Sequence, residues 1–401
     1  MRLRELIEVL EERYDPSWAE PWDEVGLVCG DPADQDTTVE RVLFAVDPVA
    51  AVVDEAIERD VQALVVHHPL LLSPVSSVAA TSPKGRVLHR LIRHGIALYT
   101  AHTSADVPEG GVNDAIARTL GLRDAEVLVP TDEVALDKIV VFAPQDAADD
   151  VRAAMTAAGA GHIGAYDSCT FTAPGQGRFR PLTGAEPAIG QVGEVETVDE
   201  VRIESVLPRA LRSEVVAAVR EAHPYEEVAF DLIEVATPPR GFTTGELRST
   251  KGHGRVGELP ALMSLRELAE LVAQRFPATA HGVRVAGDPD RRVQRVAVGA
   301  GSGESFLEDA ARAGADVYLT SDLKHHRASE FLEHRHVPAL IDIAHWAAEW
   351  TWLPLAADHV REAASARGYT VDTLVSTQVT DPWSFRVDQG DQHVDSAGGS
   401  A

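Results

Sequence analysis

The 401-residue sequence is poor in cysteine, in aromatic residues and in positive charge. Its two cysteines, Cys29 and Cys169, cannot build a disulfide framework or a cysteine-based zinc site, and such low cysteine usage fits a reducing compartment. No apolar run approaches the length of a membrane span, and residues 1–7 are typical of a charged amphipathic helix rather than a signal peptide. We therefore expect a cytoplasmic protein that is neither exported nor anchored in a membrane.

Negative charge dominates the sequence. The 36 Lys and Arg residues stand against 63 Asp and Glu residues, which gives a net charge of −27. A surface of this sign repels phosphate backbones, which argues against nucleic acid as a partner. The 45% hydrophobic and 25% charged content is that of an ordinary globular protein, and the length exceeds one hydrophobic core, so we expect two or three domains.

Strand and helix patterns alternate in the first and last thirds of the chain, which predicts α/β structure with largely parallel sheets. Between them, the order of patterns is β-α-β-β-α-β, typical of an α+β ferredoxin-like domain, with an exposed loop or hairpin over the Gly- and Pro-rich residues 174–193. The predicted boundaries are a first half at 1–130, an inserted domain at 131–240, a second half at 241–380 and a disordered polar tail at 381–401. The two halves are expected to form one metal-binding domain.

Two adjacent histidines stand where a predicted buried strand ends. The apolar run Ala63–Val66 is followed by His67 and His68, and Pro69 prevents the strand from continuing. The carboxyl ends of strands in an open α/β sheet are where ligands bind, so the pair is a candidate site. The alternative is that one histidine caps the strand and the other is a solvated loop residue.

Further histidines and carboxylates recur at strand ends. His102 and Asp106 follow the predicted strand 97–99 and are expected in a loop, whereas His345 and Glu349 are expected on one face of a helix that begins near residue 343. Taken alone, a His-x-x-x-Glu pair is also common on ordinary helix surfaces. With the first two histidines, the set offers imidazole and carboxylate ligands without a thiolate. It suits two divalent ions of zinc, manganese, iron, cobalt or nickel, whose usual chemistry in pairs is hydrolysis.

Two other stretches have both a functional and a structural interpretation. Asp322 and His325 follow the predicted strand 317–319 and are candidate catalytic acid/base residues, or simply belong to the first turn of a helix. The glycines at 299–303 are expected to form a tight turn, because they lack the lysine and the spacing of a phosphate-binding loop.

The motifs together resemble the NIF-three-like family, whose bacterial members are labelled type 2 GTP cyclohydrolase I homologues. The matching stretches are residues 22–27, 67–70, 102–106, 110–114, 301–303, 321–325 and 345–349. Family members commonly show Asn-Leu where this chain has Ser104 and Ala105, a difference that leaves the expected ligands intact. The inserted segment is similar to PII and CutA-type domains through residues 163–167 and 223–227.

The resemblance implies a site and an activity. It implies a dinuclear metal centre with His102 beside it, in a toroidal homohexamer. The implied ligands are His67, His68, Asp106, His345 and Glu349.

The implied reaction is hydrolysis of a small-molecule substrate such as a nucleotide, in which the purine imidazole ring opens and formate leaves. A metal-dependent phosphodiesterase or phosphatase and a non-catalytic, metal-loaded regulatory hexamer are the alternatives. For the insert there are two interpretations. It gates the cavity or binds a small effector, or its residues His223 and Tyr225 have a purely structural role. We favour the structural role.

Overall fold

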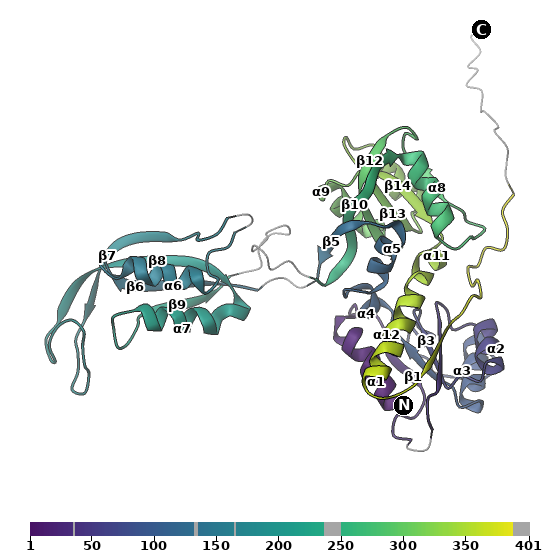
Figure 1. Ribbon diagram of the computed structural model, residues 1–401, viewed down its shortest axis with the longest axis horizontal. Helices are drawn as coiled ribbons and strands as arrows, with labels where there is room; N and C mark the ends of the chain where they lie inside the picture. Colours follow the sequence, from purple (N-terminus) through teal and green to yellow (C-terminus); the bar gives the residue numbers. More distant parts are fainter. Residues whose placement is uncertain (35–36, 132–134, 164–165, 236–249, 388–401) are drawn as a thin grey trace, which may run out of the picture. The chain divides into compact units, whose positions relative to one another are not determined.

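The computed structural model describes residues 1–34, 37–131, 135–163, 166–235 and 250–387. They form two compact units: unit 1 consists of Met1–Thr131 and Thr250–Ala401, and unit 2 of Asp132–Ser249 (Figure 1). The predicted boundary at 240/241, and residues 388–401 of the predicted disordered tail, lie outside the described residues. None of the described helices is both long and apolar enough to cross a bilayer.

The first sheet of unit 1 is mostly parallel. Its spatial order is β1 (Gly26–Cys29), β4 (Ala97–Thr100), β3 (Ala63–Val66), β2 (Arg41–Ala45) and β15 (Asp372–Val375). Only β1 runs antiparallel to its neighbour. All four residues of β3 are buried, because helices cover both faces of this sheet.

Alternate side chains of the first sheet face different helices. Leu43 and Leu64 pack with α2 (Ala50–Glu58) and α3 (Pro83–Arg93), while Phe44 and Val65 belong to a larger core that contains residues of α1 (Leu3–Arg13) and α12 (Trp352–Ala366). This alternation follows from the two-residue period of a strand. The apolar runs predicted from sequence are therefore strands buried on both faces.

The second sheet of unit 1 has mixed pairing. Its spatial order is β11 (Arg284–Ala286), β14 (Ala339–Ile343), β13 (Val317–Ser321), β12 (Arg292–Ser302), β10 (Gly252–Ser264) and β5 (Arg123–Pro130). The three central strands β14, β13 and β12 are parallel, and the outer strands pair antiparallel. The helices of this half are α8 (Leu265–Arg275), α9 (Leu307–Arg312), α10 (His325–Leu332) and α11 (His345–Trp350).

One continuous core joins the two sheets. It contains Val65 of the first sheet, Ile341 of the second and residues of α5 (Val112–Leu120), α11 and α12. The sheets also exchange edge strands, since β15 comes from the C-terminal part of the chain but pairs with β2, and β5 comes from the N-terminal part but pairs with β10. The two halves therefore share one hydrophobic core and contribute strands to each other's sheets, so they form one domain. The predicted α/β class is confirmed.

Unit 2 has the ferredoxin-like topology. Its elements in chain order are β6 (Leu136–Pro144), α6 (Ala148–Ala157), β7 (Phe171–Phe179), β8 (Glu196–Pro208), α7 (Arg212–Ala222) and β9 (Phe230–Glu234). The antiparallel sheet has the order β7-β8-β6-β9, and α6 and α7 pack together over the face that carries Val141 and Ile203 (Figure 1). The predicted β-α-β-β-α-β order is therefore confirmed.

One strand of unit 2 differs from the prediction. An exposed loop or hairpin was expected from residue 174, but β7 runs from Phe171 to Phe179 into this Gly- and Pro-rich stretch. Within the described ranges it pairs only with β8, so it is an edge strand. An edge strand tolerates Pro174 because one side of it forms no ladder hydrogen bonds.

Short helices complete the structure and connect the longer elements. They are the 3-10 helices η1 (Pro16–Trp18), η2 (Arg209–Leu211) and η3 (Glu304–Phe306), and the four-residue helix α4 (Thr103–Asp106).

Candidate metal centre

Three strand ends bring histidines and carboxylates together in unit 1. His67 and His68 follow β3. After β4, His102 precedes α4 and Asp106 is the last residue of that helix. After β14, α11 carries the pair His345 and Glu349. Two groups of these side chains have potential ligand atoms within 4.8 Å of one another, and the groups share His68. The first group is His67, His68 and His102, and the second is His68, His345 and Glu349.

The carboxylate of Glu349 lies at the middle of the cluster. Its Oε1 atom is 2.7 Å from Nε2 of His345 and 3.3 Å from Nε2 of His67, and its Oε2 atom is 3.0 Å from Nε2 of His68. Glu349 and His67 are each only 1% exposed. Asp106 approaches from the side of His67, with 3.9 Å between its Oδ1 atom and Nε2 of that histidine.

Each imidazole of the cluster has an oxygen atom within hydrogen-bonding distance of its Nδ1 atom. The Nδ1 atoms are paired as follows: His67 with the carbonyl of Ala101 at 3.1 Å, and His68 with Asp47, His102 with Asp23 and His345 with Asp322 at 2.7 Å each. When Nδ1–H donates to these acceptors, Nε2 carries the free lone pair. Histidines that bind metals are commonly fixed in this way.

Several buried atoms at the centre lack a hydrogen-bond partner. They include Nε2 of His67, Oδ1 of Asp106 and Oε2 of Glu349. Buried polar atoms are nearly always satisfied, and lone pairs directed at one another in a dry pocket repel unless a proton or a cation lies between them. The donor set of imidazole nitrogens and carboxylate oxygens therefore fits divalent first-row metal ions.

The pKa values show where positive charge is favoured. The Glu349 carboxylate outweighs burial and raises the pKa of His345 to about 11. Burial alone would lower the pKa of His68, but Glu349 and Asp47 raise it to about 10. Burial, reinforced by the charge of Glu349, raises the pKa of Asp106 well above its usual value. In the metal-free site these shifts favour protons on His345, His68 and Asp106, whereas burial lowers the pKa of His67.

The stretch from His102 to Asp106 is not the predicted loop. Residues 103–106 form α4, and His102 is the residue before its first turn. The turn is fixed by Asp23, whose second carboxylate oxygen accepts the backbone N–H of Thr103 at 3.0 Å, and by Asn113, whose amide donates to the carbonyl of Asp106 at 3.0 Å. These tertiary contacts stabilise a helical turn that the local sequence alone does not predict.

Two important residues were not singled out from the sequence. Asp23 and Asp47 orient His102 and His68, and Asp47 also accepts a hydrogen bond from Thr380. Asp47 follows β2, the strand next to β3, so the rule that ligands gather at carboxyl ends could have found it. Asp23 precedes β1 and lies in the matching stretch 22–27, which could have drawn attention to it.

The two predicted acid/base residues lie in different surroundings. Asp322 supports His345 through its hydrogen bond, which also lowers the pKa of its carboxyl group. His325 is exposed at the start of α10, where its ring lies edge-on to His326 at 5.3 Å, and it contacts none of the cluster residues among the described parts of the chain. The structure therefore places Asp322 against a candidate ligand and His325 away from the cluster.

Gly301 allows the close approach of the cluster to β12. The glycines at 299–303 do not form the predicted tight turn, because β12 continues to Ser302 with an irregular register against β13. Gly301 has φ of +59°, and a Cβ atom there would lie 3.3 Å from Oε1 of Glu349 and 3.4 Å from Cε1 of His345. A side chain at this position would push against two candidate ligands.

The variant Gly301→Ala is expected to lose stability and metal affinity together. The left-handed backbone costs a residue with a Cβ atom about 1–3 kcal/mol, and the methyl group displaces Glu349 and His345. Gly314→Ala is the matched control, because Gly314 has φ of +69° with open space around it. Chemical denaturation and metal competition measure both effects; equal metal affinity in the two variants would contradict the crowding argument.

Comparisons with known proteins agree with this organisation. Residues 1–382 match the family model described as Duf34/NIF3 (NGG1p interacting factor 3). A Mycobacterium tuberculosis protein named "GTP cyclohydrolase 1 type 2 homolog" is 47% identical over 391 residues, covering 97% of this chain and 98% of its relative. A Bacillus subtilis protein of the same name is 40% identical, over 82% and 84% of the two chains.

Solved structures give the same assignment. A Bacillus cereus protein related to NIF3 has 36% identity and a TM-score of 0.63, over 95% of this chain and 98% of its own. Staphylococcus aureus protein SA1388 has 29% identity and a TM-score of 0.64, over 96% and 99%. The chain belongs to the DUF34/NIF3 family.

Proposed function

We propose that unit 1 binds two divalent metal ions and is a metal-dependent hydrolase. The observation that carries the proposal is the convergence of imidazole Nε2 atoms, each fixed by an outer oxygen, on buried carboxylates with unpaired atoms. His67, His102 and Asp106 would hold one ion, and His68 and His345 the other. Glu349 would serve both, since Oε1 faces His67 and Oε2 faces His68.

The residues of the centre have two kinds of role, binding the ions and orienting the imidazoles. When bound, a pair of such ions activates water and stabilises negative charge on the oxygens of a substrate. Asp47, Asp23 and Asp322 keep the imidazoles oriented through Nδ1, and the buried carboxylates hold the negative charge that attracts the cations. Asp322 is half exposed, so its second carboxylate oxygen is accessible to a substrate proton.

For the substrate, we propose a purine nucleotide such as GTP. The support is the name carried by the bacterial relatives, which are up to 47% identical over nearly the whole chain. Hydrolysis of the C8–N9 bond would open the imidazole ring to a formamide, and hydrolysis of that formamide would release formate. The closest rival is hydrolysis of a phosphoester, which the same donor set can support.

Metal analysis and product assays test the proposal. We expect two ions per chain in the purified protein and formate released from GTP by the metal-loaded protein. Phosphate release from p-nitrophenyl phosphate without formate would favour the phosphoesterase. A loaded protein that produces neither would contradict the hydrolase and favour a metal-loaded regulatory protein. The proposed homohexamer is tested separately by sedimentation.

Metal binding is expected to strengthen as the pH rises. The carboxylate of Glu349 keeps His345 and His68 protonated in the metal-free site, with pKa values of about 11 and 10. An ion must displace those protons, so affinity increases by up to about tenfold per pH unit for each proton released. Competition with a chelator between pH 6 and 8 measures the slope, and a flat profile would show that the histidines are already neutral.

A further inference from the structure

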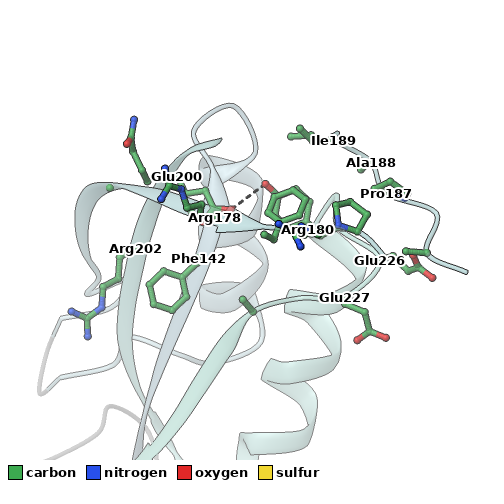
Figure 2. A pocket seen from close by; sticks show the side chains of 18 of the residues that line it. Phe142, Arg178, Arg180, Pro187, Ala188, Ile189, Glu200, Arg202, Glu226 and Glu227 are labelled. Carbon is green, nitrogen blue, oxygen red and sulfur yellow. Dashed lines mark hydrogen bonds between the residues drawn. The ribbon is translucent and has the colours of Figure 1, made fainter. Parts of the chain in front are cut away.

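Unit 2 contains a cavity that takes no part in the metal centre. Its volume is about 640 Å³, within the range of small-molecule sites. It lies on the sheet face opposite α6 and α7, because Phe142 lines it while the neighbouring Val141 and Ala143 pack under the helices. Residues of β6, β7 and β8 and the loop before β9 contribute to its walls (Figure 2).

Aromatic and small apolar side chains form most of the lining. Phe179 and Tyr225 meet edge to face with ring centroids 5.8 Å apart, and Phe142 adds a third ring. Pro187 and Ile189 line the cavity from the segment between β7 and β8 (Figure 2). Flat rings bury well against such walls, since aromatic pairs prefer offset or edge-to-face contact.

A buried histidine fixes two of these walls. His223 accepts the backbone N–H of Tyr225 at Nδ1 over 3.1 Å, and its Nε2 lies 2.9 Å from the carbonyl oxygen of Phe142. This pattern requires Nε2–H to donate, so the ring ties the turn after α7 to the end of β6. The structural role predicted for His223 holds, but the three residues Tyr225, Glu226 and Glu227 all line the cavity.

A carboxylate inside the cavity is preorganised as an acceptor. Tyr225 donates its hydroxyl hydrogen to Oε1 of Glu200 at 3.0 Å (dashed line in Figure 2). On the partner strand, Gly177 makes room for this group, because a Cβ atom there would lie only 2.0 Å from Oε2 of Glu200. The second oxygen of Glu200 has no hydrogen bond among the described residues and can accept N–H donors from a ligand.

Arginines supply the opposite charge. Arg202 is paired with Glu204 at 3.0 Å, and Arg178 donates to Thr197 at 3.3 Å. Arg180 also lines the cavity and has no ion pair or hydrogen bond within the described ranges (Figure 2). A free guanidinium beside aromatic walls is suited to a carboxylate or phosphate group, which it can bind in bidentate fashion.

We propose that this cavity binds a planar heteroaromatic molecule that carries ring N–H donors and one anionic group. The ring lies against Phe142, Phe179 and Tyr225, its N–H groups donate to Glu200, and its anionic group pairs with Arg180. All lining residues belong to unit 2 and none of them is a candidate metal ligand, so this proposal does not rest on the proposed hydrolysis.

Pterin-6-carboxylate is a suitable probe, because it is flat, fluorescent, rich in N–H donors and carries one carboxylate. Fluorescence anisotropy of the full, metal-loaded chain is expected to show saturable binding. Arg180→Gln should weaken it at least tenfold and leave unsubstituted pterin unaffected, whereas Glu200→Gln should weaken both. Arg152→Gln is the matched control, because Arg152 lies on α6, is paired with Asp149 and does not line the cavity.

Three outcomes would overturn the proposal. The first is an absence of saturable binding by the wild-type chain. The second is binding that Arg180→Gln and Glu200→Gln leave unchanged but Glu349→Gln abolishes, which would place the probe at the metal centre. The third is probe failure together with self-association that Leu182→Glu disrupts, since Leu182 is 69% exposed and would then belong to an interface between copies.

Discussion

Replacing Glu349 by glutamine is expected to remove bound metal and hydrolytic activity together. Its carboxylate is the only group that reaches His67, His68 and His345 within 3.3 Å among the described residues. An amide keeps the shape but loses the charge and one good ligand oxygen. Because even supporting residues of metal sites change affinity about 10–100-fold, loss of this central ligand should cost at least about 100-fold.

Metal content after dialysis and chelator competition measure this effect. Glu362→Gln is the matched control, because Glu362 is exposed on α12 and should leave both readouts unchanged. Asp47→Asn provides an intermediate case, since it acts on His68 only through Nδ1 and should weaken binding about 10–100-fold. Full occupancy of both sites in folded Glu349→Gln would rule out the shared-ligand arrangement.

Removing the guanidinium of Arg255 is expected to destabilise unit 1 by about 3–5 kcal/mol. Arg255 is 2% exposed, and it pairs with Asp114 and donates to the carbonyls of Gly252, Gly254 and Pro108 at 2.8 to 3.0 Å. Arg255→Ala removes the cation that pairs with Asp114 and leaves several carbonyls without this donor. These contacts connect β10 to the segment between α4 and α5, so their loss loosens the junction of the two halves beside the metal centre.

Urea denaturation followed by tryptophan fluorescence isolates the effect on unit 1. All six tryptophans of the sequence lie in its two segments, at positions 18, 22, 346, 350, 352 and 383. Arg361→Ala is the control, because Arg361 forms an exposed pair with Asp358 on α12 and should cost less than about 1 kcal/mol. Equal midpoints for the two variants would mean that the buried network contributes nothing to stability.

Local patterns predict the fully buried strands of unit 1 well but miss two of its edge strands. The run at 63–66 is recognisable because both faces of β3 are buried, so its residues are all apolar and its end is marked by His67 and Pro69. The edge strands β5 and β11 were missed, since most of their residues are exposed and the pattern of burial is weak. Pairing across more than a hundred residues, as between β5 and β10, has no signature in a short window.

Local patterns in the sequence likewise indicate some residues of the candidate site and not others. His345 and Glu349 are connected by helix geometry, and the strand-end rule indicates His67 and His68. The orienting carboxylates Asp23 and Asp47 act only through tertiary contacts with His102 and His68, so spacing in the sequence does not reveal them. His325 was grouped with Asp322 because the two are close in sequence, but the start of α10 turns it toward solvent.

The exchange of β5 and β15 has a consequence for the order of events during synthesis. The pairing of Arg41 with Asp372 spans 331 positions, so a growing chain displays the open edge of β2 until almost the whole polypeptide has left the ribosome. Contacts of such long sequence separation form slowly, and an unpaired strand edge is prone to adhere to other chains. Truncation shortly before β15 should therefore yield aggregated protein, although every candidate metal ligand would still be present.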